Sequence, residues 1–383
     1  MAYSPVFEFA TAQRIIFGTG SVSQAPEIAA TLGQRVLIVL THSADSIASV
    51  LEQGLHERQR ATVRCHISGE PDVQSIEAGV QAAREEGCDC VIAVGGGSAI
   101  DSGKAIAGLL TNGGNVLDYV EVVGAGKPIT QPAAPFIAIP TTAGTGAEVT
   151  RNAVISIPDK RVKVSMRSPH LLPTVALVDP ALTHTMSPDV TASTGLDALT
   201  QLIEPYTCNR SNPFSDAFAL SGLDCAARSL LAAYTDGSPE SRQDMAYASL
   251  CGGLALANSG LGAVHGFAGV IGGRYPIPHG VCCAILLPHV TEANLAALQG
   301  REPNSPVLVR YRTVERMLPG DGDLVDKLRR LVEALHIPTL SAFGISADAI
   351  PDLVTQSQRA SSMKANPIIL TADELSGILA AAL

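Results

Sequence analysis

Short apolar runs alternate with helical patterns through the first half of the chain. Four runs rich in β-branched residues predict strands, over residues 35–40, 62–67, 90–94 and 135–140, and the first of them is predicted to be buried. A strand that is covered on both faces is a near-continuous apolar run, and residues 36–40 form such a run. Amphipathic patterns over residues 43–58 and 73–86 predict helices between the first three strands. Strands that alternate with helices favour right-handed crossovers and a mainly parallel sheet.

The pattern changes after Asp179-Pro180. Strand-like pieces between residues 154 and 178 predict a hairpin that returns to the sheet, and after them the chain is rich in Ala and Leu. These later stretches predict helices over residues 188–206, 215–234, 244–259 and 281–298, followed by a helical tail from residue 307. We therefore predict two domains: an α/β domain with a parallel sheet, residues 1–184, and an all-helical domain, residues 185–383.

Composition excludes several classes of protein. At 383 residues, with 46% apolar and 16% charged positions, the chain suits two compact domains. The net charge of −10 and the lack of any basic run argue against a nucleic-acid partner. We expect no membrane span and no signal peptide, because the apolar segments are short and the N-terminus lacks a cationic start. Eight scattered cysteines without a CxxC pair predict reduced thiols in the cytoplasm.

One predicted strand-to-helix junction carries a run of glycines. The apolar run ending at Val94 is followed by Gly95-Gly96-Gly97-Ser98 and then directly by a helical pattern. Glycines let the backbone approach a ligand closely, and the N–H groups at a helix start are unpaired and point outward. Together with the helix dipole they form a receptor for phosphate oxygens. The junction indicates a pyrophosphate-binding turn; tight packing alone is the competing interpretation.

The helical half carries a second group of candidate residues. Asp197 is followed one turn later by Gln201, and His265 and His279 stand fourteen positions apart further along the chain. One carboxylate and two imidazoles form a plausible set of ligands for Zn²⁺ or Fe²⁺, with a position left open for water or substrate. Each residue is isolated in the sequence, so spacing alone does not bring them together.

Three long segments and one short one resemble the signatures of the iron-containing (group III) alcohol dehydrogenases. They cover residues 95–101, 140–150, 272–280 and 286–290. The resemblance spans nearly the whole chain in unbroken order. It implies an N-terminal dinucleotide-binding domain and a helical C-terminal domain, with the active site in the cleft between them, in agreement with the division predicted from the pattern.

The resemblance also implies a set of cofactor contacts for NAD or NADP. Carried over by position, they are Thr41, Gly95, Gly96, Gly97, Ser98, Asp101, Thr141, Thr142, Thr145, Asn152 and Lys163. Relatives that prefer NAD tend to carry an acidic residue at the position of Thr41, where it bonds the ribose hydroxyls. A threonine there does not repel a 2′-phosphate, and no arginine follows to bind one. The choice between NAD and NADP therefore stays open.

The family's four metal ligands fall on Asp197, Gln201, His265 and His279. The second ligand is normally a histidine, and Gln201 offers only a neutral carbonyl oxygen, which is a weaker donor. Three ligands would remain, similar to the zinc arrangement of glycerol dehydrogenases, so that both iron and zinc are open. His265 and His279 are also the candidate catalytic residues, either as ligands or, without metal, as hydrogen-bond donors to a developing oxyanion.

A further departure lies at Gly269, where the family usually has a histidine suspected in proton transfer. Because Gln201 and Gly269 both replace histidines of the family, a metal-free keto acid reductase that resembles the maleylacetate reductases is an open alternative. Arg274 and Arg151 are candidates for binding the carboxylate of such a substrate. A nucleotide-binding protein with a decayed site, and a lyase similar to the dehydroquinate synthases, also stay open.

The activity that the resemblance implies is reversible hydride transfer between NAD(P)(H) and a small alcohol or aldehyde. A divalent metal would polarise the substrate oxygen, while the protein orients the cofactor. We expect a small-molecule substrate, no nucleic-acid or membrane partner, and a homo-oligomer, since dimers are common in the family.

Overall fold

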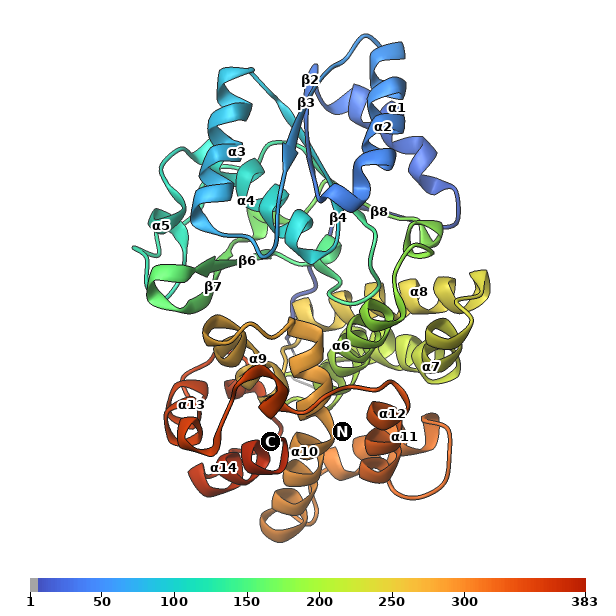
Figure 1. Cartoon of the computed structure of the whole chain (residues 1–383), viewed down its shortest axis with the longest axis vertical. Coiled ribbons are helices and arrows are strands. Elements are labelled where there is room, and N and C mark those ends of the chain that lie inside the picture. The colour runs from blue at the N-terminus through green and yellow to red at the C-terminus, as the bar shows by residue number, and fades with distance from the viewer. Residues whose placement is uncertain (1–5) are drawn as a thin grey trace. The chain divides into compact units, whose positions relative to one another are not determined.

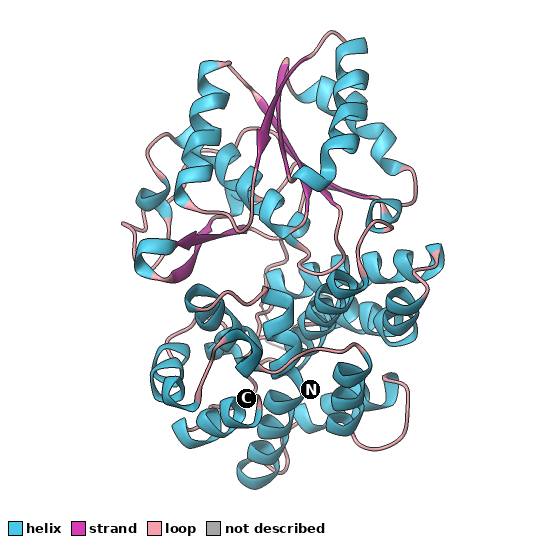
Figure 2. Cartoon of the chain, viewed as in Figure 1, coloured by secondary structure: helices cyan, strands magenta, loops and turns pink. Residues whose placement is uncertain are grey.

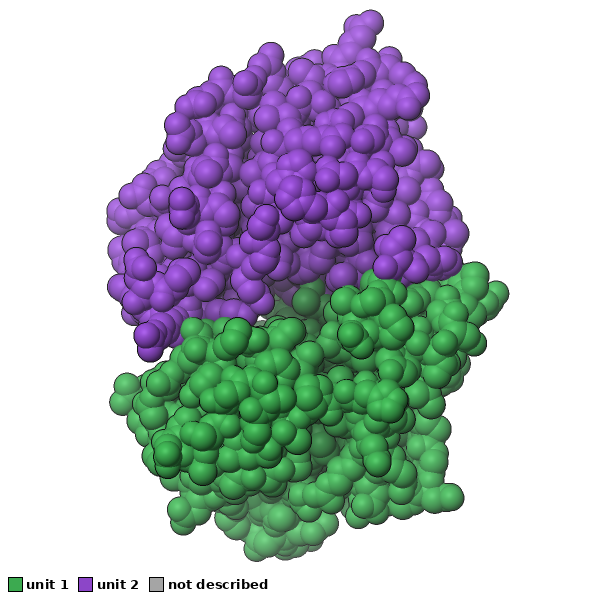
Figure 3. Space-filling model, in the orientation of Figure 1, with its two compact units in different colours: residues 1–9, 143–145, 186–383 green, residues 10–142, 146–185 purple. Residues whose placement is uncertain are grey.

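The computed structural model describes residues 6–383, which divide into two compact units (Figure 3). The sheet unit comprises residues 10–142 and 146–185. The helical unit comprises the N-terminal segment up to residue 9, residues 143–145 and residues 186–383. The main division thus lies between Thr185 and Met186, next to the predicted boundary. Two short segments that the sequence assigns to the α/β domain belong to the helical unit instead.

The sheet unit contains all the strands of the described chain (Figures 1 and 2). The strands are β1 (Arg14–Phe17), β2 (Arg35–Leu40), β3 (Ala61–His66), β4 (Cys90–Gly95), β5 (Phe136–Pro140), β6 (Asn152–Ile157), β7 (Val162–Arg167) and β8 (Val175–Val178). The α-helices are α1 (Ala25–Leu32), α2 (Asp45–Glu57), α3 (Val73–Glu85), α4 (Gly97–Asn112) and α5 (Val116–Tyr119). Short 3-10 helices are η1 (Ser21–Gln24), η2 (His42–Ala44), η3 (Ala147–Val149), η4 (Pro158–Lys160), η5 (Pro169–Leu171) and η6 (Pro180–Thr183).

Six of the strands form one parallel sheet, in the order β1-β8-β5-β4-β2-β3. Strands β4 and β5 are buried along their whole length, which explains their continuous apolar runs. Leu37 and Val39 of β2 pack in the core shared with α3 and α4, whereas Val36 and Ile38 face the core shared with α1 and α2 (Figure 1). Helices therefore cover both faces of the sheet, and the predicted α/β fold is confirmed.

The predicted hairpin between residues 154 and 178 differs from the observed structure. Strands β6 and β7 pair antiparallel with each other in a separate two-stranded sheet, with Asn152 opposite Arg167. Only β8, which follows them, joins the main sheet, between β1 and β5. The alternating burial of β6 accounts for the difference, because this strand has only one buried face.

The helical unit consists of α-helices and short 3-10 helices. They are α6 (Pro188–Thr207), α7 (Pro213–Thr235), α8 (Pro239–Asn258), α9 (Ala263–Arg274), α10 (His279–Arg301), α11 (Val307–Met317), α12 (Leu324–Ala334), η7 (Leu340–Phe343), η8 (Ala347–Ala349), α13 (Ile350–Ser357), η9 (Met363–Ala365) and α14 (Ala372–Ala381). Three long helices begin in the same way, with a capping Ser187, Asn212 or Ser238 followed by proline. The cap accepts an N–H of the first turn, and proline at the first position has no N–H to leave unpaired.

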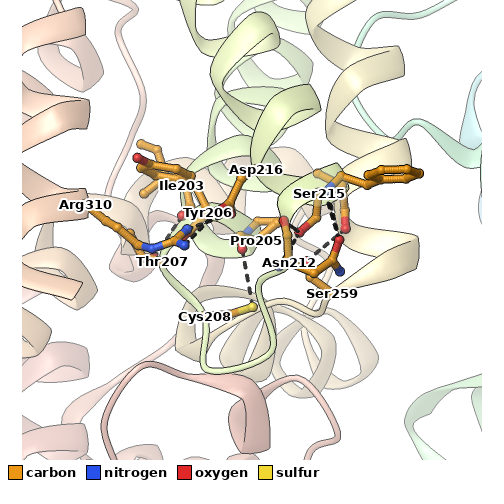
Figure 4. Close-up of polar contacts among 12 residues, drawn as sticks. Ile203, Pro205, Tyr206, Thr207, Cys208, Asn212, Ser215, Asp216, Ser259 and Arg310 are labelled. Atoms are coloured by element: carbon orange, nitrogen blue, oxygen red, sulfur yellow. Dashed lines mark hydrogen bonds and ion pairs between the residues drawn. The ribbon is translucent and has the colours of Figure 1, made fainter. Parts of the chain in front are cut away.

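A buried ion pair holds the C-terminal end of α6, the helix that carries Asp197. The guanidinium of Arg310 on α11 donates to both carboxylate oxygens of Asp216 on α7, each at 2.6 Å (Figure 4). The same group donates to the carbonyl oxygen of Tyr206 at 2.5 Å and lies over the ring of that residue. Bidentate pairing of this kind is geometrically specific. It therefore fixes α6 relative to two neighbouring helices.

The N-terminal segment packs on α7 through aromatic rings, which places it in the helical unit. Phe7 contacts Phe214 edge-on at 5.3 Å between ring centroids, and Phe9 stacks on Phe218 at 5.6 Å. Aromatic pairs with this spacing are favourable beyond the area that they bury. Sequence periodicity carries no sign of such a contact, so the predicted boundary could not include it.

One described helix is long and apolar enough to cross a membrane. It is α10, and 67% of its apolar window is buried inside the helical unit. Asn294 on this helix is buried and bonded to Tyr311 and Asn366. Burial within the fold accounts for the apolar composition of α10, as it does for the core helices of globular domains.

A second buried ion pair fastens the hairpin to α4. The fully buried Lys104 donates to Asp101 Oδ1 and to Thr150 Oγ1, each at 3.0 Å. Its third contact is the carbonyl oxygen of Asn152 at 2.6 Å. The other Asp101 oxygen accepts from the N–H of Val154 at 2.9 Å. All three protons of the ammonium group are therefore used, and α4 is tied to the start of β6.

A buried carboxyl group lies in the charge field of the same lysine. Glu148 on η3 is 2% exposed. Burial raises the pKa of its carboxyl to about 7, although a backbone hydrogen bond and the charge of Lys104 act in the opposite direction.

We expect Glu148 to weaken the fold as the pH rises from about 5 to about 8. Its pKa in the folded chain lies above the usual value of 4.5, so the folded state binds this proton more tightly, and the stability gained from it is lost as the pH rises through about 7. Glu148→Gln has no such proton and should lose about 2 kcal/mol less unfolding free energy over this range. Denaturant titrations at both pH values measure the difference. The exposed Glu240→Gln is the control, and equal pH dependence of wild type and Glu148→Gln would contradict the prediction.

Candidate functional site

The glycine-rich turn lies at the point where the order of the parallel strands reverses. Strand β2 connects to β3 on one side, whereas β4, which also pairs with β2, connects to β5 on the other. Ligands of open α/β sheets bind beyond the carboxyl ends of the strands at such a switch point. Thr41 directly follows β2, and Gly96 directly follows β4. The topology therefore places the glycine-rich turn at the carboxyl ends of β2 and β4, where a cofactor is expected to bind.

The first turn of α4 can receive an anion. Its N-cap, Gly96, offers no side chain to the helix N–H groups. Gly96, Gly97 and Ser98 are partly exposed, while the residues on both sides of them are buried. Unpaired N–H groups at an accessible helix start, with the positive end of the helix dipole behind them, suit a phosphate group.

Gly95 allows the chain to turn there. Its φ is +153°, and a Cβ at this position would lie 2.8 Å from Ala99 Cβ and 3.2 Å from Thr41 Oγ1. Thr142 borders the next residue, since a Cβ at Gly96 would lie 3.4 Å from it. The N–H of Thr141 donates to the Gly95 carbonyl oxygen at 3.0 Å. The structure thus brings five predicted cofactor residues together at one end of the sheet.

The remaining predicted cofactor residues have other surroundings. The carboxylate of Asp101 accepts hydrogen bonds from Lys104 and from a backbone N–H, which gives it a structural role, and cofactor binding by Asp101 stays a prediction. Asn152 holds Lys104 through its carbonyl oxygen. Lys163 pairs with Glu70 at 3.0 Å. Thr145 belongs to the helical unit. For Asn152, Lys163 and Thr145 cofactor binding stays a prediction.

The candidate metal ligands of the helical unit converge. Asp197 comes from α6, His265 from α9 and His279 from the first turn of α10. Asp197 Oδ1 lies 3.4 Å from His265 Nε2 and 3.8 Å from His279 Nε2. The two rings are 5.4 Å apart between centroids. Residues from three separate helices therefore aim their donor atoms at one point.

The donor atoms fit a divalent cation. Asp197 is 1% and Gln201 3% exposed, and the oxygens Asp197 Oδ1 and Gln201 Oε1 are buried without a hydrogen-bond partner. Buried polar atoms are almost always paired, so two such oxygens on adjacent turns of α6 point to a missing partner. Carboxylate and imidazole donors are those expected for Zn²⁺ or Fe²⁺.

The charges within this cluster are strongly coupled. Burial alone would lower the pKa of His265, but Cys283, Asp197 and Glu204 outweigh it and hold that pKa well above its usual value. Cys283, followed by Asp197, likewise raises the pKa of His279 to about 9 against the effect of burial. Burial opposes ionisation of Asp197, yet the two histidines lower its pKa. The pocket therefore attracts positive charge, whether a proton or a cation.

Glu204 orients His265 and is a site residue that the sequence analysis missed. Its Oε2 accepts from His265 Nδ1 at 2.7 Å, and its Oε1 accepts from the N–H of Val264, also at 2.7 Å. When a cation displaces the proton of Nε2, the proton that Glu204 keeps on Nδ1 leaves the Nε2 lone pair available to that cation. A carboxylate behind a histidine ligand is common in metal sites. The spacing of Asp197, Gln201 and Glu204 along one helix face is the signal that could have identified it.

Glu204→Gln is expected to weaken metal binding by about tenfold to a hundredfold. Both carboxylate oxygens accept hydrogen bonds, so an amide NH₂ in place of either one would face a donor. Competition with a chromophoric chelator measures the dissociation constant for zinc. The exposed Glu240→Gln should bind zinc like the wild type. An unchanged zinc affinity of Glu204→Gln would rule out this orienting role.

Three further residues, Cys283, Gly269 and Arg274, have surroundings that matter for the predicted site. Cys283 lies within 4 Å of both histidines and is not among the site residues predicted from the sequence. A Cβ at Gly269 would meet no atom within 4 Å, so this position borders open space. Arg274 forms an ion pair with Asp352, which removes its main support as a carboxylate-binding residue.

Comparisons with known proteins match both halves of the chain. Residues 12–180 match the family described as iron-containing alcohol dehydrogenase, and residues 191–383 match the C-terminal domain of the Fe-containing alcohol dehydrogenase family. Alcohol dehydrogenase 4 of Saccharomyces cerevisiae is 34% identical over 369 residues, which cover 95% of each chain.

Solved structures agree with this assignment. A 1,3-propanediol oxidoreductase superposes with a TM-score of 0.90 at 30% identity, over 99% of this chain and 100% of that one. A sulfoacetaldehyde reductase from Bifidobacterium kashiwanohense, in complex with NAD⁺, superposes with a TM-score of 0.85 at 28% identity and 99% coverage of both chains. By sequence along its whole length and by fold, the chain belongs to the iron-containing alcohol dehydrogenase family.

Proposed function

We propose that this enzyme transfers a hydride between a small alcohol or aldehyde and a nicotinamide dinucleotide, with a divalent metal held in the helical unit. The observation that carries the proposal is the convergence of Asp197, His265 and His279 around a buried oxygen without a partner. The membership of the family and the accessible glycine-rich helix start after β4 support it. The metal-free keto acid reductase is less favoured, since Arg274 is paired with Asp352.

The residues of the helical unit have separate tasks in this reaction. Asp197 supplies the negative charge that a buried cation requires, and His265 and His279 present Nε2 atoms to the same point. Glu204 holds the proton on His265 Nδ1, so that Nε2 stays available. A divalent cation bound there would act as a Lewis acid that lowers the pKa of an alcohol and stabilises negative charge on its oxygen.

The sheet unit would bind the cofactor. The N–H groups that open α4 would receive the pyrophosphate, as the exposure of Gly96 to Ser98 allows. Thr41 Oγ1 lies 3.0 Å from Ser43 Oγ, and these neutral hydroxyls neither repel nor bind a 2′-phosphate strongly. We therefore propose that the enzyme uses NAD and also accepts NADP. Cytoplasmic location and a homo-oligomeric state stay predictions of the sequence.

Metal content and turnover, measured together, test the proposal. The protein is purified without added metal and analysed for elements, and NADH and NADPH oxidation is followed on a panel of small aldehydes before and after chelation. We expect one zinc or iron per chain and turnover that is lost to the chelator and restored by metal. Intact turnover without metal would support the metal-free reductase instead. Cofactor binding with no turnover on any substrate would support a decayed site.

A further inference from the structure

Cys283 lies in the same cluster as the three metal ligands. It stands four residues after His279 on α10, which puts both side chains on one face of the helix. Its Sγ is 3.7 Å from His279 Nε2 and 3.8 Å from His265 Nε2. The donor atoms of Asp197, His265, His279 and Cys283 all lie within 4.8 Å of one another. The side chain of Cys283 is fully buried.

We propose that the Cys283 thiolate is the fourth protein ligand of the metal and that it makes the site selective for zinc over iron. This inference rests on the proposed metal-dependent function. It assigns a strong fourth ligand to a site in which Gln201, a weak donor, replaces the usual histidine. The thiol gives up its proton to solvent when it binds, and the sulfur lone pair that is freed forms the bond to the cation.

The distances match a tetrahedral site before any metal enters. With bonds of about 2.0–2.3 Å to nitrogen, oxygen and sulfur, the donor atoms of a tetrahedral zinc site lie about 3.3–3.8 Å apart. Four of the six separations among these donors are 3.4, 3.7, 3.8 and 3.8 Å, and the other two, Asp197 to Cys283 and His265 to His279, are within 4.8 Å. Little movement would therefore be needed to form such a site. A substrate oxygen would enter as a fifth ligand, as catalytic zinc sites allow.

The chemistry of sulfur decides between the candidate metals. A thiolate is a soft, charged donor that zinc accepts readily, whereas the carbonyl oxygen of Gln201 is neutral and hard. Two anionic ligands, Asp197 and Cys283, would also neutralise the charge of a divalent cation in a buried site. With one carboxylate, one thiolate and two imidazoles, the set is suited to zinc.

Cobalt substitution of the wild-type enzyme tests the ligand directly. The protein is stripped of metal with a chelator, reconstituted with Co²⁺ alone, and its absorption spectrum is recorded. A near-ultraviolet thiolate-to-cobalt charge-transfer band, accompanied by intense visible bands of tetrahedral cobalt, is expected. Cobalt that binds and shows visible bands without the charge-transfer band would overturn the Cys283 assignment and leave the metal-dependent function standing. Failure to bind any divalent metal would instead overturn the proposed function.

A matched pair of variants assigns the band to one cysteine. Cys282 is the adjacent residue and is equally buried, but it is not part of the donor cluster of the described residues. Cys283→Ser is expected to lose the band and to bind zinc about a hundredfold more weakly, whereas Cys282→Ser keeps both. Zinc affinity should also fall more in Cys283→Ser than in Gln201→Ala. A band that survives in Cys283→Ser, or a larger loss in Gln201→Ala, would overturn the proposal.

Competition between metals tests the selectivity. Stripped wild-type protein is exposed to equal free concentrations of Zn²⁺ and Fe²⁺ under anaerobic conditions, and the bound metals are counted. Zinc is expected to dominate in the wild type by more than it does in Cys283→Ser. Equal preference in the two proteins would show that Cys283 does not set the choice of metal.

Discussion

Replacing Asp197 by asparagine is expected to lower kcat/KM by about a thousandfold, which corresponds to about 4 kcal/mol of transition-state stabilisation. Asparagine keeps the shape of the side chain but removes its charge. Asp197 is only 1% exposed, and its Oδ1 faces both histidines. Without that charge, most of the free-energy cost of moving a divalent cation from water into this site would not be offset.

The measurement combines steady-state kinetics with metal analysis of the purified variant. Asp197→Asn is expected to contain little metal, and excess zinc should restore only part of the activity. Asp189→Asn is the control, because it makes the same chemical change at an exposed position on the first turn of α6. It should keep both metal and turnover. Full metal content with full activity in Asp197→Asn would exclude this residue as a ligand.

The second large effect is expected from Gly95→Ala. A methyl group there would lie 2.8 Å from Ala99 Cβ and 3.2 Å from Thr41 Oγ1, with φ at +153°. The backbone must shift, and the shift displaces the first turn of α4, where the pyrophosphate is proposed to bind. We expect the dissociation constant for NADH to rise about tenfold or more and the free energy of unfolding to fall by about 1–3 kcal/mol.

Gly18→Ala separates backbone strain from the effect on the site. Gly18 has a similar φ of +149° in the same unit, but a Cβ there would meet no atom within 4 Å. It should lose stability through strain alone and bind NADH normally. Fluorescence titration with NADH and thermal unfolding of both variants make the comparison. Normal NADH binding by Gly95→Ala would contradict the assignment of this turn to the cofactor.

The sheet can be predicted well because its central strands are buried on both faces. The apolar pattern predicts β2 at residues 35–40, where it lies, and β4 differs by one residue. Helix α9 is harder to predict, because it contains four glycines that lower its intrinsic preference for helix. Tertiary packing stabilises it instead, and a Cβ at Gly266 would already lie 2.9 Å from Met363 Cε.

The candidate site can be predicted only in part. Asp197, His265 and His279 belong to residue types that rarely stand in apolar helices without a reason, and the resemblance to a family locates them. Glu204 and Cys283 escape prediction because a glutamate in a helix usually faces solvent and a cysteine in an apolar run usually packs as a small hydrophobic residue. Only the convergence of α6, α9 and α10 shows that the two touch the same histidine.

The path of the chain has a practical consequence for work on separate domains. The polypeptide leaves and re-enters the helical unit, so that this unit contains residues 6–9 and 143–145 as well as the long C-terminal part. A fragment that begins at Met186 would lack Phe7 and Phe9, and the rings of Phe214 and Phe218 would lose these partners. Truncation at the main boundary should therefore yield an aggregation-prone fragment, whereas a circular permutant that rejoins the N-terminal segment to the C-terminal part would keep the aromatic contacts.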